Sequence, residues 1–238
     1  MIKLFEQFNN EQKIHDICEK YDIENYTINP DGSIDVDGDV DLNNKGIFKI
    51  PIKFNRINGF FDCSENDLTT IENSPKEVSG YFDCSNNQLT SLVGGPTEVG
   101  SNFYCTNNKL TSLEGSPERV GDNFSCYNNQ LTSLYGSPER VDGYFSCYNN
   151  QLTSLYGSPM IIGGVFLLKY NPISIIDTST EVKGDINIGY TNFDDKIKSL
   201  SQEKLKILFE HGVDYNIFNL DDSINDSRLE RMFNDFNI

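Results

Sequence analysis

One sequence unit recurs five times in the middle of the chain, between Phe60 and Pro159. The copies follow, with variations, the pattern V-x-G-x-F-x-C-x-x-N-x-L-T-S-L-x-G-x-P, and they recur with a constant 21-residue period. A fixed period of this length is typical of a solenoid, in which each repeat packs only on its neighbours. The repeat therefore predicts an elongated molecule built from stacked coils. The cysteines of the pattern are Cys63, Cys84, Cys105, Cys126 and Cys147.

The period continues in degenerate form on both sides of the clear copies. Leu42 lies one period before Cys63, and Leu168 lies one period after Cys147. A last copy, one residue shorter, places Ile188 in the cysteine position. The sequence thus predicts about eight rungs over residues 42–193, and degenerate outer rungs are expected because terminal repeats shield the core from water.

Each copy contains a predicted strand. Phe and Cys alternate with a variable residue, so F-x-C predicts a short strand with two inward side chains, and stacked copies would pair as a parallel sheet. The Gly and Pro residues of the pattern predict an extended or turn-like return path. The repeat cysteines are a full period apart, without the close ligand pairs of zinc sites, so we expect buried, unmodified thiols.

A ladder of asparagines follows the predicted strands. A buried Asn at this point is expected to bond main-chain groups that the bend leaves free, because buried polar groups need partners. The ladder consists of Asn66, Asn87, Asn108, Asn129 and Asn150.

Residues 1–41 are predicted to cap the first rung. Asn9 and Gln12 resemble a capping pair that opens a helix, and the apolar positions then continue at helical spacing to Tyr21. The segments 26–28 and 33–36, joined by the turn N-P-D-G, predict a hairpin. The acidic run that begins at Asp35 lacks the Gly and Glu that a calcium loop requires, so we interpret it as strand with Val inward and Asp outward.

Residues 194–238 are predicted to form two amphipathic helices. Ser199 with Gln202 resembles a capping pair for the first, which Gly212 ends, and Ser227 with Glu230 resembles a capping pair for the second. We expect these helices to close the open end of the solenoid. The alternative is that the last helix docks on a partner.

Charge and composition narrow the classes of partner. The 238-residue chain has a formal net charge of -17. This charge disfavours binding to nucleic acid or to an anionic membrane, because both are bound through Lys and Arg. No apolar run is long enough to span a bilayer, and the start MIKLFEQFNNEQKIHD lacks the apolar segment of a signal peptide. We therefore expect a cytoplasmic protein.

The string F-x-C-x-x-N-x-L-T-S-L resembles the leucine-rich-repeat signature L-x-L-x-x-N-x-L, with Phe and Cys in place of two leucines. The copies of N-N-Q-L-T-S-L-x-G-S-P, with the opening N-Y-T-I-N-P-D-G-S-I-D-V-D-G-D-V, are similar to leucine-rich-repeat proteins encoded by bacteriophages. The resemblance covers roughly residues 10–193 and also extends to the short repeats of bacterial effector proteins. It implies a partner-binding surface around the strands, in the cytoplasm of a bacterial host. The departure is the V-x-G-x-F spacing, which leaves open how the chain enters each strand.

The variable residues around the strands are the candidate binding surface. Six of the eighteen places before Phe, between Phe and Cys, and after Cys are aromatic. Tyr supplies a large rigid contact area and a hydroxyl, and it is enriched at interface hot spots. The alternative is that these tyrosines only reflect the high strand propensity of Tyr. Tyr135 and Tyr156 belong to the return path and are weaker candidates. The candidate residues are Phe60, Tyr81, Asp83, Tyr104, Tyr127, Tyr144 and Tyr148.

No reaction is apparent in the sequence. His15 and His211 lie at opposite ends, and no nucleophile motif, phosphate loop or metal-binding motif occurs. We expect no enzyme, cofactor or metal, and interpret the chain as a non-catalytic protein–protein interaction module that binds a host protein. Two alternatives are a structural component of a virion or assembly scaffold, and a mimic of nucleic acid that uses the acidic surface.

Overall fold

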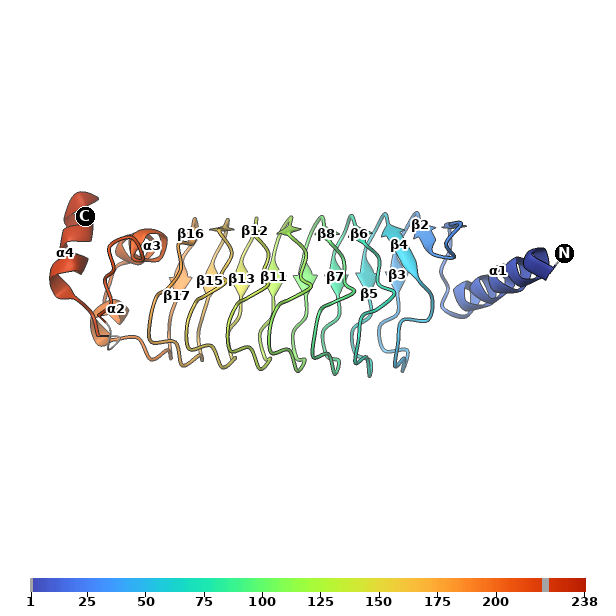
Figure 1. The fold of residues 1–238 in the computed structure, drawn as a ribbon, viewed down its shortest axis with the longest axis horizontal. Helices are drawn as coiled ribbons and strands as arrows, with labels where there is room; N and C mark the ends of the chain where they lie inside the picture. Colours follow the sequence, from blue (N-terminus) through green and yellow to red (C-terminus); the bar gives the residue numbers. More distant parts are fainter. Residues whose placement is uncertain (1, 220–222) are drawn as a thin grey trace.

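The chain forms an elongated β-solenoid with helices at both ends (Figure 1). This computed structural model describes residues 2–219 and 223–238, and the side chains from residue 10 onward within those ranges. Each coil of the solenoid contributes one short strand to each of two parallel sheets, which we call sheet A and sheet B. The predicted fold class and the 21-residue period are confirmed.

Sheet B contains the strands that the F-x-C pattern predicts. Equivalent residues pair in parallel register, so that Phe82 lies opposite both Phe61 and Phe103. Eight strands of the described chain stand in this sheet and bound about seven turns of the coil, in agreement with the predicted number of rungs. They are β3 (Val40–Asp41), β5 (Phe61–Asp62), β7 (Phe82–Asp83), β9 (Phe103–Tyr104), β11 (Phe124–Ser125), β13 (Phe145–Ser146), β15 (Phe166–Leu167) and β17 (Ile186–Asn187).

Sheet A is a second sheet that the sequence analysis did not identify. Its strands end at the Val of V-x-G-x-F, and the bend at the following residues carries the chain into sheet B. The predicted hairpin is present, because β1 and β2 pair antiparallel at the end of sheet A. The strands are β1 (Tyr26–Ile28), β2 (Ile34–Val36), β4 (Phe54–Ile57), β6 (Glu77–Val78), β8 (Glu98–Val99), β10 (Arg119–Val120), β12 (Arg140–Val141), β14 (Ile161–Ile162) and β16 (Glu181–Val182).

The return path between the sheets consists of turns, as predicted. Gly115 and Gly136 adopt φ values of +93° and +84°, a conformation that disfavours side chains. A Cβ at Gly136 would also overlap the backbone N of Glu114 in the preceding coil. Glycine is therefore required by both backbone conformation and close packing of successive coils.

The core is made of ladders that repeat the same side chain in each coil. The rings of five consecutive Phe residues, from Phe61 to Phe145, stack with centroids 5.1–5.5 Å apart and planes within 14°. The repeat cysteines are buried and free, and burial raises the pKa of the Cys105 thiol well above its ordinary value. Stacked rings and small thiols fill the interior, so these residues bury apolar surface.

The asparagine ladder connects each coil to the one before it. Asn108 Nδ2 donates to Cys84 O at 3.0 Å in the preceding coil and to Cys105 O at 3.3 Å in its own. Asn108 Oδ1 accepts from the backbone N of Leu89 at 3.0 Å. One side chain therefore satisfies main-chain groups that the bend would otherwise leave unpaired.

Helix α1 (Ile2–Lys20) and the acidic run form the N-terminal end. The helix begins before Asn9, so the predicted capping pair at Asn9 is wrong; the segment IKLFEQF contains no Gly or Pro to interrupt it. Ile14 and Cys18 are buried against the first coil, whereas the start of α1 projects from the solenoid (Figure 1). In the acidic run Val36 and Val40 point inward and Asp37 is exposed, as predicted.

Three helices close the C-terminal end: α2 (Asp195–Lys198), α3 (Gln202–His211) and α4 (Asp226–Asp235). Helix α3 packs on β16 and β17, and its Phe209 ring makes edge contacts with the rings of Phe166 and Phe193. Helix α4 packs on α3 through Leu229 and Met232, both of which are buried. The helices therefore cap the solenoid.

The predicted capping pairs of these helices are wrong in detail. Ser199 follows α2 as its C-cap, and Ser201 instead accepts from the backbone N of Lys204 at the start of α3. Asn225, not Ser227, caps α4 by accepting from the backbone N of Arg228. The short helix α2, which the sequence analysis did not predict, displaces the first cap by two residues.

Candidate functional site

The outer face of sheet B carries three columns of side chains, one rung apart along each column. The first column precedes Phe and contains Asp39, Phe60, Tyr81, Asn102, Asn123, Tyr144 and Val165. The second lies between Phe and Cys and contains Asp41, Asp62, Asp83, Tyr104, Ser125, Ser146 and Leu167. The third follows Cys and contains Asn43, Ser64, Ser85, Thr106, Tyr127, Tyr148 and Lys169.

The structure gathers four of the candidate residues into a tyrosine patch, defined by Tyr104, Tyr127, Tyr144 and Tyr148. The rings of Tyr127 and Tyr148 stack with centroids 4.4 Å apart and planes 9° apart. Burial, with the neighbouring Tyr144 hydroxyl, raises the pKa of Tyr104 to about 12. All four side chains are half-buried, so the patch combines ordered apolar rings with polar edges.

Two serines form the floor of the tyrosine patch. Ser125 and Ser146 were expected on the open surface, yet each is only 2% exposed. Ser125 Oγ donates to the Tyr144 hydroxyl at 3.4 Å, whereas Ser146 Oγ has no hydrogen-bond partner in the described chain. The small serines let the neighbouring rings lie close to the sheet, which holds the rings in place.

The remaining candidates lie at the N-terminal end of sheet B. The rings of Phe60 and Tyr81 stack with centroids 4.7 Å apart and planes 7° apart. Burial, and then the carboxylates of Asp62 and Asp83, raise the pKa of Tyr81 to about 12. The tyrosine patch and this acidic end therefore occupy opposite halves of one continuous face.

A third pair of stacked rings was missed by the sequence analysis. Tyr170 and Tyr190 stack at 4.6 Å and are 52% and 73% exposed. Their φ values are +57° and +59°, in the position that Asn149 and Asn128 occupy in earlier coils. This conformation is unusual for a bulky residue, so Tyr in the place of the repeat Asn was the available signal.

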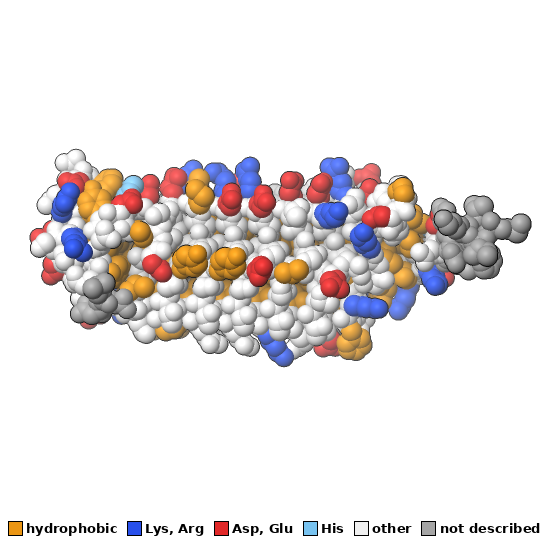
Figure 2. Space-filling view, viewed as in Figure 1, with side chains coloured by type: hydrophobic (Ala, Val, Ile, Leu, Met, Phe, Trp, Pro, Cys, Tyr) orange, Lys and Arg blue, Asp and Glu red, His pale blue; other side chains and the backbone are white. Residues whose placement is uncertain are grey.

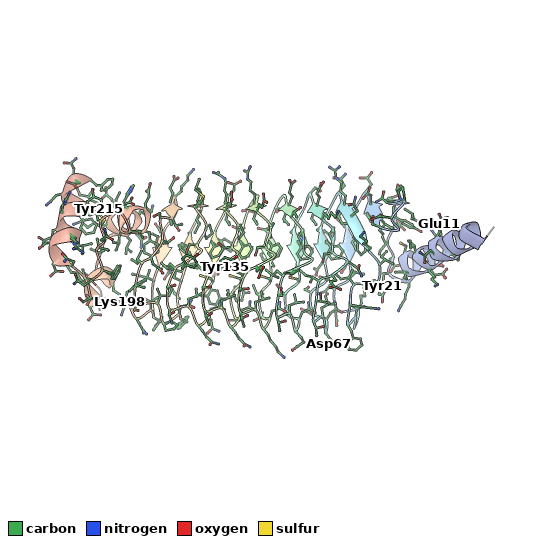
Figure 3. All side chains as sticks on the ribbon, in the orientation of Figure 1. Glu11, Tyr21, Asp67, Tyr135, Lys198 and Tyr215 are labelled. Atoms are coloured by element: carbon green, nitrogen blue, oxygen red, sulfur yellow. The ribbon has the colours of Figure 1, made fainter. Side chains whose placement is uncertain are left out.

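The return path carries a different exposed row. Tyr135 and Tyr156 are 54% and 61% exposed, and the equivalent positions in other coils hold Glu72, Val93 and Glu114. Figure 2 shows hydrophobic and acidic side chains mixed along the middle of this face, where Figure 3 labels Tyr135. These tyrosines do not stack in the described structure, unlike those on sheet B.

Sheet A contributes an open groove of about 630 Å³. Glu77, Glu98 and Arg119 line it, together with Gly100 and Gly121, whose missing side chains deepen it. Arg119 lies 4.0 Å from Asp142 and thus has an acidic partner within the groove. The groove is open and lined by side chains of both charges, so we regard it as a weaker candidate than sheet B.

The two histidines are far apart and in structural contacts. His15 Nδ1 lies 2.5 Å from the Tyr26 hydroxyl, and the His211 ring stacks on Phe236. Among the described residues, no group of three or more His, Cys, Asp or Glu is placed to hold a metal ion. Within the same residues, no helix combines the length and apolar character needed to cross a membrane.

Comparison of the chain with family models, with curated proteins and with solved structures found no match. The geometry of the chain's own residues is therefore the basis for its candidate function. On that basis the outer face of sheet B is the strongest candidate site, because its aromatic side chains are paired, half-buried and in register.

Proposed function

We propose that the chain is a non-catalytic interaction module that binds a partner protein through the outer face of sheet B. The observation that supports this most is the tyrosine patch, in which the Tyr127 and Tyr148 rings stack 4.4 Å apart on a solvent-facing sheet. Rings already ordered by stacking lose little conformational entropy on binding, and Tyr is enriched at interface hot spots. The solenoid presents this patch on a rigid surface.

The identity of the partner class rests on the resemblance of the repeat to leucine-rich repeats of bacteriophage proteins. A phage protein of this kind would meet bacterial proteins in the cytoplasm of its host. We therefore propose a host protein as the partner, with inhibition of a host defence as the fitting role. The half-buried hydroxyls of Tyr104 and Tyr144 would orient it.

The test is affinity capture from a bacterial host lysate, read by mass spectrometry at low and high salt. We expect the unaltered chain to retain one host protein at both salts, because apolar ring contacts are not screened. The double variant Tyr104→Ala, Tyr127→Ala should lose that protein while still melting cooperatively.

The matched control is Tyr135→Ala with Tyr156→Ala, which removes two more exposed rings from the return path. This control should capture the same protein as the unaltered chain. Equal capture by both double variants would refute a role for sheet B, and no specific capture would favour a structural role, tested by presence in purified particles.

A further inference from the structure

The N-terminal half of the sheet B face contains three aspartates in register on adjacent strands. Asp41 pairs with Asp62, and Asp62 pairs with Asp83, on strands β3, β5 and β7. Parallel strands lie about 4.8 Å apart, so the three carboxylates are close neighbours. Like charges directly opposite each other destabilise a sheet. Oδ1 of Asp41, Asp62 and Asp83 accepts a hydrogen bond at 2.8–2.9 Å from the backbone N of the residue two places on. These bonds engage one oxygen of each carboxylate and leave the repulsion between neighbouring charges in place.

A stacked aromatic pair lies beside the aspartate ladder. Phe60 and Tyr81 occupy the adjacent column of the same coils, after Asp39, whose Oδ1 accepts from the backbone N of Phe60 at 2.9 Å. The carboxylates of Asp62, Asp83, Asp41 and Asp39 all act on the Tyr81 hydroxyl. We call these six residues the acidic-aromatic patch: Asp39, Asp41, Phe60, Asp62, Tyr81 and Asp83.

Within the described chain, no ion pair neutralises the patch. The ion pairs of the described residues all involve carboxylates outside the patch, such as Asp31 with Lys53. Oδ1 of Asp41 accepts a hydrogen bond from the backbone N of Asn43 at 2.9 Å, and Oδ1 of Asp62 accepts one from the backbone N of Ser64 at 2.9 Å. One oxygen of each carboxylate thus remains available to an external donor.

The chemistry of the patch selects an organic cation. Among the described residues, no group of three or more His, Cys, Asp or Glu is placed to hold a metal ion. The four carboxylates instead act on the Tyr81 hydroxyl, whose ring is stacked on Phe60. A guanidinium or ammonium group interacts favourably with an aromatic face and also donates to carboxylates. Arginine suits both contacts because its planar group stacks and donates at once.

We infer that the acidic-aromatic patch binds an arginine- or lysine-bearing segment of the partner protein. This inference rests on the proposed function, and it assigns a chemical class to part of the partner's surface. The rest of the partner would cover the tyrosine patch farther along the same face. A cation in the patch would also relieve the repulsion between Asp62 and Asp83, which are directly paired.

The test uses the purified full chain and a fluorescein-labelled, arginine-containing peptide, with a citrulline peptide of the same length as the neutral control. Fluorescence anisotropy gives the Kd at about 50 mM and about 300 mM NaCl. We expect the arginine peptide to bind, and Asp62→Asn with Asp83→Asn to weaken binding about tenfold. The citrulline peptide should bind no better to the unaltered chain than to this variant.

The matched control variant is Glu72→Gln with Glu114→Gln, which removes two negative charges from the exposed return path. It should bind the arginine peptide as the unaltered chain does. Equal weakening by both variants would overturn the inference, because it would mean that the peptide senses only the net charge. No binding of the peptide at either salt would also overturn it.

The aromatic contribution is tested separately with Tyr81→Leu, which keeps the four carboxylates. We expect about threefold weaker binding of the arginine peptide, from loss of the cation–π contact. Unchanged affinity would remove the rings from the inference. Capture of a host protein without peptide binding would support the proposed function and refute the inference about the patch. Peptide binding without any captured protein would support cation binding by the patch and refute the proposed function.

Discussion

At the scale of single residues, the period accounts for most of what the sequence revealed. Residues one period apart lie side by side, so the stacks of Phe60 on Tyr81 and of Tyr127 on Tyr148 follow from one-dimensional alignment. The burial of Ser125 and Ser146 did not follow, because it depends on how neighbouring rings lean over the sheet. Rotamers of neighbouring columns are not encoded in the period.

The aspartate ladder makes a prediction about pH. Burial raises the pKa of Asp83, and the carboxylates of Asp62 and Glu65 add to the rise, while hydrogen bonds from Ser85 oppose it. A raised pKa means that the folded chain binds the proton more tightly than the unfolded chain. The contribution of Asp83 to stability is therefore full below about pH 4 and is lost as the pH rises through the raised pKa.

The Asp83→Asn variant should accordingly melt at a higher temperature than the unaltered chain at pH 7. The difference in Tm should shrink as the pH falls toward 4, because a protonated carboxyl and an amide are both neutral. Thermal melts followed by circular dichroism across this range provide the measurement. Asp67→Asn, on an exposed turn, is the control and should change Tm little (Figure 3). A lower Tm for Asp83→Asn at pH 7 would contradict the assignment.

At the scale of elements, strong periodic signals were predictable and short or irregular ones were not. F-x-C alternates inward and outward residues and was recognised as a strand. Strands such as β8 (Glu98–Val99) bury only one side chain, the Val, so they offer no alternation of two inward residues and sheet A was missed. The cap of α3 shifted from Ser199 to Ser201 because the preceding helix α2 has only four residues, fewer than a sequence pattern can define.

The C-terminal cap contains an element-scale device that the sequence did not suggest. Gln202 Oε1 accepts from the backbone N of Ile186 at 2.7 Å, and its Nε2 donates to Ile186 O at 3.0 Å. The side-chain amide thus occupies the place of a peptide group from a further strand beyond β17. It satisfies an edge that would otherwise be free to pair with another chain.

Replacing this amide should loosen the cap. We expect Gln202→Ala to destabilise the chain by about 1–2 kcal/mol, because two backbone groups of Ile186 lose their partner. Hydrogen exchange should show faster exchange at Ile186 and in α3, with little change at Phe103 in the middle of sheet B. The control Glu203→Ala removes a neighbouring exposed side chain. Equal hydrogen-exchange rates at Ile186 in the two variants would show that the packing of α3, and not the Gln202 amide, protects the edge of sheet B.

At the scale of the whole molecule, the solenoid and its capped end were predictable because one short unit repeats. The acidic end of the sheet B face was visible in the sequence, because Asp62 and Asp83 lie one period apart. The gathering of the four tyrosines into one patch came from the structure, since it depends on contacts between columns. The two patches place aromatic and acidic side chains on one face of sheet B. The return path carries a second row of exposed side chains, which includes Tyr135 and Tyr156.

The most direct measurement is hydroxyl-radical footprinting of the chain with and without its captured partner. We predict that oxidation of Tyr104, Tyr127 and Tyr148 falls on binding, because the partner covers the sheet B face. Oxidation of Tyr135 and Tyr156, on the return path, should stay unchanged. Protection of Tyr135 and Tyr156 with no change on sheet B would contradict the proposed interface and place it on the return path.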